Sequence, residues 1–209
     1  MPAARLAIIA CGALAREIRA VLGAQLPHIS LRCLPAVLHN RPERIAPAVR
    51  SAIRAARAEG LSVFVAYAEC GTGGALDRLL GEEGVQRLPG PHCYAFYTGL
   101  EAFAAAGDAD MRSFFVTDFL ARQFDALVWQ PLGLDRHPEL RHAYFGQYER
   151  VVYLAQTEDA AVARAARSAA ARLGLAFERR FTGYGDLGSP AGVLARAALG
   201  IWSDGPPQA

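Results

Sequence analysis

A chain of 209 residues, of which 53% are hydrophobic, is long enough for one sizeable α/β domain and short for two independent cores. Its net charge of +2, from 22 basic residues that are all arginine and 20 acidic ones, gives no basic surface of the kind that binds nucleic acid. We therefore expect a single domain over residues 1–200 and no nucleic-acid partner. Residues 201–209, with the sequence "IWSDGPPQA", are expected to form a flexible tail.

No stretch reaches the roughly 18–20 apolar residues that a membrane span requires. The short apolar run near the N-terminus is followed at once by Arg16, Glu17 and Arg19, whereas a secretory signal needs a longer apolar region and a cleavage site of small residues. We therefore expect a cytoplasmic protein with no membrane partner. Because thiols stay reduced in the cytoplasm, the four cysteines indicate metal binding or catalysis rather than disulfides.

Short β-branched and apolar runs alternate with helical patterns along the chain. This alternation predicts a Rossmann-like α/β fold, a mostly parallel sheet with helices on both faces. Apolar residues at every fourth position predict two amphipathic helices, and the alanine-rich segment 160–173 predicts a third. The residues that set the first two patterns are Leu14, Ile18 and Leu22, and Ile45, Val49 and Ile53. Strands are expected at Leu6–Cys11, Ile29–Leu34, Leu61–Tyr67, Val85–Leu88, Ser113–Thr117, Val151–Ala155 and Ala176–Phe181.

Three cysteines lie at or just beyond the ends of predicted strands. Cys11 ends the first strand, Cys70 follows the third and Cys93 follows the fourth. In an open parallel sheet, ligands bind beyond the carboxyl ends of the strands, which meet at one edge. Each cysteine also precedes a predicted helix, whose N-terminal amides stabilise a thiolate, the form that binds a metal or attacks an electrophile. The sequence therefore predicts a metal site formed by these three cysteines.

Two kinds of metal centre fit three thiolates, a zinc ion with an open coordination position and an iron–sulfur cluster with one free iron. The spacing of Cys11, Cys70 and Cys93 matches no compact zinc or ferredoxin motif, so the prediction rests on their placement. The alternative is that they are ordinary buried cysteines at packed strand ends. Cys33 lies inside a predicted strand and is expected to be buried in the core.

Three polar residues are candidates for moving a proton at this edge. Glu17 lies on the helix after Cys11, His92 precedes Cys93, and Asp118 directly follows the predicted strand "SFFVT". A helix N-cap is the alternative explanation of Asp118, because aspartate caps well. A role in orienting a metal ligand is the alternative for His92.

Gly12 and Gly71 directly follow two of the cysteines and are predicted to bind a cofactor through their backbone amides. The glycines of "CGTGG" match neither a P-loop nor the GxGxxG dinucleotide fingerprint, so they do not indicate a nucleotide.

The order of "ACGALAREI", "YAECGTGG", "GPHCYAFYTG" and "SFFVTDFL" resembles the bacterial and archaeal domain of unknown function family 1638. That family has a Cys-Gly after the first strand, a Tyr-Gly-x-Cys-Gly and a later cysteine before an aromatic or apolar helix. Here Ala68 replaces the more usual glycine, while Cys70 is kept. The resemblance implies an α/β fold and the importance of Cys11, Cys70 and Cys93, but no reaction. It also implies corrinoid-dependent methyltransferase components as partners, although this chain lacks the DxHxxG corrinoid pattern.

Two functions remain open from the sequence. In the first, the protein is an enzyme whose metal or cluster acts on a small thiol, methyl or sulfur-containing substrate. In the second, it is a non-catalytic accessory protein that binds or delivers a metal or cofactor to a corrinoid-dependent methyl-transfer system. A redox protein using a cysteine pair is a weaker alternative, because no CxxC motif is present.

Overall fold

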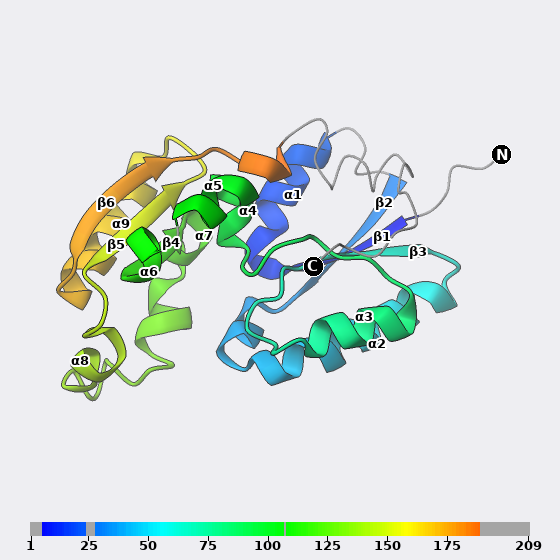
Figure 1. Cartoon of the computed structure of the whole chain (residues 1–209), viewed down its shortest axis with the longest axis horizontal. Coiled ribbons are helices and arrows are strands. Elements are labelled where there is room, and N and C mark those ends of the chain that lie inside the picture. The colour runs from blue at the N-terminus through cyan, green and yellow to red at the C-terminus, as the bar shows by residue number, and fades with distance from the viewer. Residues whose placement is uncertain (1–5, 24–27, 107, 189–209) are drawn as a thin grey trace. The chain divides into compact units, whose positions relative to one another are not determined.

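The computed structural model describes residues 6–23, 28–106 and 108–188, and the predicted tail over 201–209 lies outside them. Contacts divide the described residues into two compact units, one made of those up to 96 together with 186–188, the other of those between 97 and 185. Each unit holds one open, three-stranded parallel sheet flanked by helices (Figure 1). The predicted α/β class is therefore confirmed, with the strands distributed over two sheets. The single domain over residues 1–200 stays a prediction.

The sheet of the first unit has the order β2 (Ile29–Leu34), β1 (Leu6–Cys11), β3 (Ser62–Ala66). All pairs are parallel, and the last pairs of the two ladders place Cys11 opposite Leu34 and Ala10 opposite Ala66. The chain steps from β1 to β2 in one direction and from β2 to β3 in the other. Right-handed crossovers therefore place α1 (Ala15–Leu22) and α2 (Ile45–Ala58) on opposite faces, as Figure 1 shows.

The helices of the first unit follow the predicted periodicity. Ile45, Val49 and Ile53 are fully buried on α2, and Ala56 of the same helix packs against Ala7 of the central strand. Helix α3 (Ala75–Glu83) lies beside α2 (Figure 1). The predicted strand Val85–Leu88 is represented by a single parallel bridge from Arg87 to Val65 of β3. The shorter helical segments are η1 (Gly12–Leu14), η3 (Ala36–Asn40), η4 (Pro42–Arg44) and α4 (Tyr94–Thr98).

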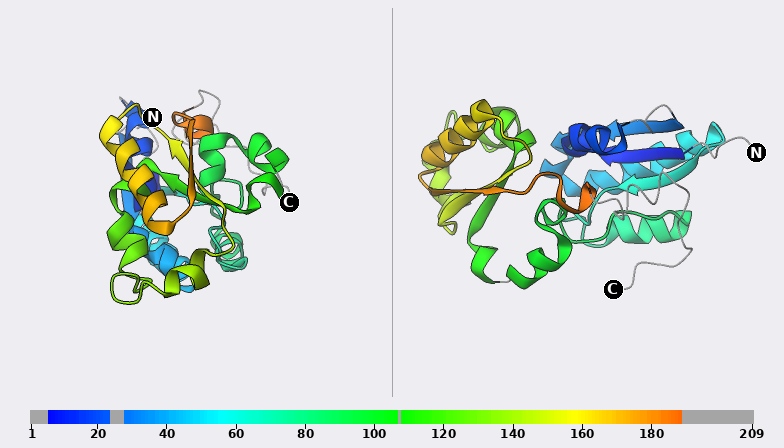
Figure 2. Two further views of the ribbon diagram at one scale, coloured as in Figure 1. Left: turned by 90° about the vertical axis from the view of Figure 1, so that its left-hand side faces the viewer. Right: turned by 90° about the horizontal axis from the view of Figure 1, so that it is seen from above.

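The sheet of the second unit has the order β4 (Ser113–Thr117), β5 (Arg150–Ala155), β6 (Ala176–Phe181). Because both crossovers run in the same direction, α7 (Asp118–Arg122) and α9 (Ala160–Leu173) lie on the same face and pack together. Figure 2 shows α9 running alongside this sheet. On the other face, Phe103 of α5 (Leu100–Ala106) contacts Phe115, with ring centroids 6.2 Å apart. The remaining segments are α6 (Asp108–Met111), the π-helix η5 (Asp125–Trp129), α8 (Leu140–Phe145) and η6 (Gly185–Leu187).

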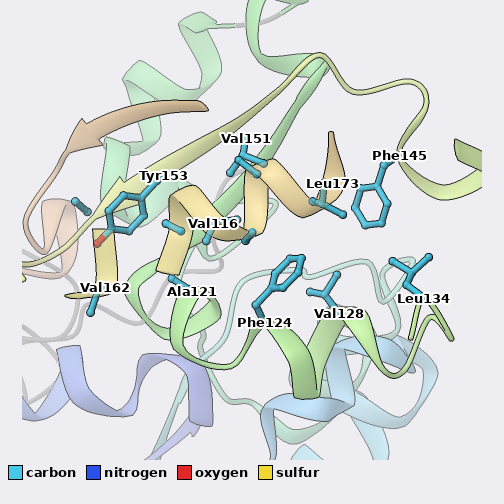
Figure 3. Packing of buried hydrophobic residues seen from close by; sticks show 14 residues of the cluster. Val116, Ala121, Phe124, Val128, Leu134, Phe145, Val151, Tyr153, Val162 and Leu173 are labelled. Atoms are coloured by element: carbon cyan, nitrogen blue, oxygen red, sulfur yellow. The ribbon is translucent and has the colours of Figure 1, made fainter. Parts of the chain in front are cut away.

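The core of the second unit fills the space between its sheet and α9. Val151 and Tyr153 of β5 are fully buried, and they pack with Phe124, Leu173 and the alanines of α9 (Figure 3). The small alanine side chains let α9 approach the sheet closely, so the larger strand residues fill the remaining volume. Among the helices in the described part of the chain, none has the length and hydrophobicity to cross a bilayer.

Gly12 is required by a close approach of two backbone segments at the end of β1. A Cβ atom at this position would lie 2.9 Å from the carbonyl oxygen of Leu34 and 3.5 Å from the amide nitrogen of Ala36. Gly12→Ala is therefore expected to lower the free energy of unfolding by about 1–3 kcal/mol, measured by urea denaturation. Gly81→Ala is the control, because Gly81 lies inside α3 and an added Cβ there would meet no atom within 4 Å, so the change should raise stability by up to about 1 kcal/mol. Unchanged stability in Gly12→Ala would contradict this account of the glycine.

Candidate metal site

Four potential metal ligands gather at the carboxyl edge of the first sheet. Cys11 ends β1, His39 lies in η3 after β2, Cys70 follows β3, and Cys93 follows the bridge at Arg87. The sulfur atoms of Cys70 and Cys93 are 3.4 Å apart. The sulfur of Cys11 lies 3.7 Å from Nδ1 and 4.0 Å from Nε2 of His39. We refer to Cys11, His39, Cys70 and Cys93 as the cysteine–histidine cluster.

Three members of the cluster could hold one metal ion. The ligand atoms of His39, Cys70 and Cys93 all lie within 4.8 Å of one another. Two sulfurs bound tetrahedrally to one zinc ion, with bonds near 2.3 Å, are separated by about 3.8 Å, a few tenths of an ångström more than the 3.4 Å between Cys70 and Cys93. Cys11 lies beside His39 and outside this group of three. A possible metal site is therefore present at the predicted edge, and the ligand role of Cys11 stays a prediction.

The imidazole of His39 is oriented by two contacts. Its Nδ1 lies 3.1 Å from the carbonyl oxygen of Ala36, which can only accept a hydrogen bond. Nδ1 therefore carries the hydrogen, and Nε2 is the nitrogen that a metal ion would use. The ring also stacks on Tyr67, with centroids 6.2 Å apart and planes inclined by 11°. Both contacts fix the orientation of the ring, as a ligand role would require.

The backbone at Cys70 is strained. Among the described residues it is the one non-glycine residue with positive φ, at +52°. This left-handed conformation is unfavourable for a side chain with a Cβ atom and persists where the surroundings impose it. The Cys70 amide donates to the carbonyl of Pro91 at 2.9 Å, and the Glu69 amide donates to that of Gly90 at 3.1 Å. These bonds join the Cys70 loop to the segment that leads to Cys93.

Glu69 organises the loop that carries Cys70. Its carboxylate accepts hydrogen bonds from the amides of Gly71 at 2.8 Å and Gly74 at 3.0 Å, and from the hydroxyl of Thr72 at 2.6 Å. Partial burial acts to raise the pKa of Glu69, but these hydrogen bonds prevail and lower it. Gly71, with φ of +77°, takes part in this turn, and its predicted cofactor role stays a prediction.

The charges of the cluster are coupled. A hydrogen bond from the Cys93 thiol lowers the pKa of Cys70 to about 5, aided by His39 and opposed by burial. The same hydrogen bond, together with burial, raises the pKa of Cys93 well above its usual value. Burial lowers the pKa of His39, but hydrogen bonds to Cys11 and Cys70 outweigh it and raise that pKa to about 11. These shifts favour the thiolate at Cys70, the thiol at Cys93 and the imidazolium at His39 in the metal-free protein at neutral pH.

The residues predicted to move a proton lie in different places. Glu17 is buried on α1 at 4% exposure, and His92 is exposed, with its ring 6.2 Å from that of Tyr94. Asp118 belongs to the second unit, where it accepts hydrogen bonds from the Tyr153 hydroxyl at 2.7 Å and from the Gln156 amide at 3.1 Å. The catalytic roles of Glu17, His92 and Asp118 stay predictions.

Two expectations from the sequence are wrong. Thr117, not Asp118, caps helix α7, because the Thr117 side chain accepts the hydrogen bond from the Leu120 amide. Cys33 is exposed rather than buried. It lies on β2, an edge strand of a three-stranded sheet whose residues are at most partly covered. A cysteine inside a strand is buried only where layers cover that face.

His39 is the cluster residue that the sequence prediction missed. It lies in "AVLHN", five residues after the end of β2, and so at the same carboxyl edge as the three cysteines. The strand-end rule that selected Cys11, Cys70 and Cys93 would have selected it as well, had it been applied to histidine after every predicted strand.

Comparison with known families agrees with the resemblance seen in the sequence. The family described as "Protein of unknown function (DUF1638)" matches residues 33–189, and the chain belongs to this family. His39, Cys70 and Cys93 lie inside the matched segment, whereas Cys11 precedes it. No match was found among curated proteins or among solved structures.

The low pKa of Cys70 predicts an unusual pH dependence of its reactivity in the metal-free protein. Because the thiolate persists until the pH falls to about 5, alkylation of Cys70 by iodoacetamide should change little between about pH 8 and 6 and fall below that. The measurement is residue-specific mass spectrometry of quenched digests. Cys33 is the control, since it is exposed and desolvation raises its pKa, so its rate should drop about tenfold per pH unit over this range. A Cys70 midpoint above about pH 8 would contradict the assignment.

The hydrogen bonds of Glu69 predict an indirect effect on metal binding. Glu69→Gln replaces one acceptor oxygen by an NH₂ group. The side chain can then no longer accept all three hydrogen bonds from the Gly71 and Gly74 amides and the Thr72 hydroxyl. Loss of such an outer contact typically weakens metal affinity by about 10-fold or more, measured by competition with a chromophoric zinc chelator. Glu82→Gln is the control, because Glu82 is exposed on α3 and paired with Arg50. Equal zinc affinity in both variants would show that Glu69 does not position Cys70.

Proposed function

We propose that this member of the DUF1638 family is a metal-dependent enzyme in which His39, Cys70 and Cys93 bind one thiophilic metal ion. The fourth coordination position would take a small thiol, methyl-bearing or other sulfur-containing substrate. The observation that carries this proposal is the convergence of three ligand atoms within 4.8 Å of one another at the carboxyl edge of a parallel sheet.

The ligand set and its spacing favour zinc over an iron–sulfur cluster. Two thiolates and one imidazole are ligands that zinc prefers, and three protein ligands are typical of catalytic zinc sites. In a four-iron cluster each cysteine binds a different iron, which spreads the sulfurs to roughly 6–7 Å. The distance of 3.4 Å between Cys70 and Cys93 instead suits two ligands of one ion.

The charge balance supports an open position. Two thiolates from Cys70 and Cys93 and a neutral His39 cancel the charge of a divalent ion, so an anionic donor from a substrate can still bind. When bound, such an ion lowers the pKa of a thiol that it coordinates and so supplies a thiolate at neutral pH. In this proposal Cys11 flanks His39, and its sulfur accepts a hydrogen bond from the Ala13 amide at 3.3 Å.

The metal itself is tested by composition. The protein is purified without oxygen, and its zinc, iron and acid-labile sulfide are measured. Wild type is expected to hold about one zinc ion per chain and no sulfide. Cys70→Ser and His39→Ala should lose the zinc, because each removes one of three ligands. Cys33→Ser is the control and should keep it, since Cys33 is exposed on β2. Sulfide and iron in the pure protein would replace the zinc proposal by a cluster.

The open position is tested with cobalt in place of zinc. Small thiols should bind the cobalt and change its absorption, and Cys11→Ser should retain both metal and thiol binding. If instead Cys11→Ser loses the metal and the cobalt-loaded wild type binds none of the added thiols, Cys11 is the fourth ligand and the site is closed. That result would reject the enzyme proposal and favour the accessory role in a corrinoid-dependent methyl-transfer system. Glu17→Gln should keep the metal and slow turnover if Glu17 moves a proton.

A further inference from the structure

Tyr67 lies beside the cluster and has no role in the proposal so far. It directly follows β3, is fully buried, and stacks on the ring of His39. The loop from Tyr67 to Cys70 therefore supplies both an aromatic support for one ligand and the sulfur of another.

The hydroxyl of Tyr67 has an unusual environment. Its oxygen is buried, and among the described residues it has no partner with hydrogen-bonding geometry. Most buried hydroxyls in folded proteins are hydrogen-bonded, so one that is not calls for an explanation. Burial raises the pKa of Tyr67, and the nearby sulfurs of Cys11, Cys93 and Cys70 raise it further. The Tyr67 hydroxyl is therefore a buried donor near the sulfur atoms of the cluster, and no described residue supplies its acceptor.

We propose that Tyr67 is a substrate-binding residue, whose hydroxyl donates a hydrogen bond to the sulfur of a thiolate bound at the fourth position of the metal. This inference rests on the proposed metal site and names its ligand class, small thiols bound as thiolates. A hydrogen bond to a charged acceptor is about twice as strong as one between neutral groups, so the hydroxyl favours thiolates over neutral donors such as imidazole.

Cys11 offers a different explanation of the same hydroxyl. Cys11 is one of the sulfurs near the Tyr67 hydroxyl, and it is the sulfur that lies outside the three-ligand group, so it is the alternative acceptor for that hydroxyl. If Tyr67 served only Cys11, its loss would change the reactivity of Cys11 and leave the binding of added thiols alone. The two roles therefore differ in what they predict for a variant without the hydroxyl.

The experiment compares cobalt-loaded wild type with Tyr67→Phe, using 2-mercaptoethanol as the probe and the sulfur-to-cobalt absorption as the signal. Cobalt affinity should stay within about twofold, whereas the affinity for the thiol should fall by about 10-fold or more. Affinity for imidazole should change much less. Tyr148→Phe is the matched control, because it removes a hydroxyl from the aromatic cluster of the second unit.

Each outcome bears on one proposal or both. Equal thiol affinity in wild type and Tyr67→Phe, with or without a change in the alkylation rate of Cys11, would overturn the role of Tyr67 and leave the metal site standing. Absence of cobalt binding in wild type would overturn both. If Tyr67→Phe fails to fold, 3-fluorotyrosine is placed at position 67 alone, and its fluorine resonance should shift when thiol is added to the cobalt-free zinc protein. No shift there would also overturn the inference.

Discussion

The parallel pairing of β2, β1 and β3 is the constraint on which the cluster depends. Parallel strands end at the same edge, and the register brings Cys11 opposite Leu34, the last residue of β2. The chain after β2 and the chain after β3 therefore start on either side of Cys11. A histidine and two cysteines that are far apart in sequence need only short loops to reach one point. An antiparallel arrangement would send these strand ends to opposite edges.

Two residues of the cluster region adopt arrangements that are locally unfavourable. Cys70 takes a left-handed backbone conformation, and Tyr67 buries a hydroxyl with no partner of good geometry among the described residues. Neither feature favours folding, so the rest of the loop must compensate. The carboxylate of Glu69 does so by accepting hydrogen bonds from the loop amides. Backbone hydrogen bonds to the carbonyls of Gly90 and Pro91 connect the loop to the next segment. Such concentrated strain is typical of functional sites.

The sequence predicted local structure well, because periodicity and propensity act over short distances. The strands Leu6–Cys11, Ile29–Leu34 and Ser113–Thr117 and the helix Ala160–Leu173 have the predicted bounds. The division of the strands between two sheets was not predicted. Nothing in the local sequence of β3 or β4 shows that the two strands belong to different sheets. Exposure of Cys33 depends on the edge position of β2 and so on the same pairing. The placement of Cys70 near Cys93 followed from the strand-end rule, whereas His39 was missed because the rule was applied to cysteines and not to the histidine in the short 3-10 helix after β2.

The protons of the cluster provide positive charge beside the ligand atoms, as a metal ion would in the proposed site. The Cys93 thiol donates to the Cys70 thiolate, and the His39 imidazolium neutralises the same sulfur. In the proposed site, Cys70 and Cys93 would hold a divalent ion as thiolates and His39 as a neutral imidazole, so its binding would release one proton from Cys93 and one from His39. The sulfurs of Cys70 and Cys93 are already 3.4 Å apart, and the three ligand atoms lie within 4.8 Å of one another. Binding of an ion at the proposed site would then exchange protons for metal with little rearrangement of the chain.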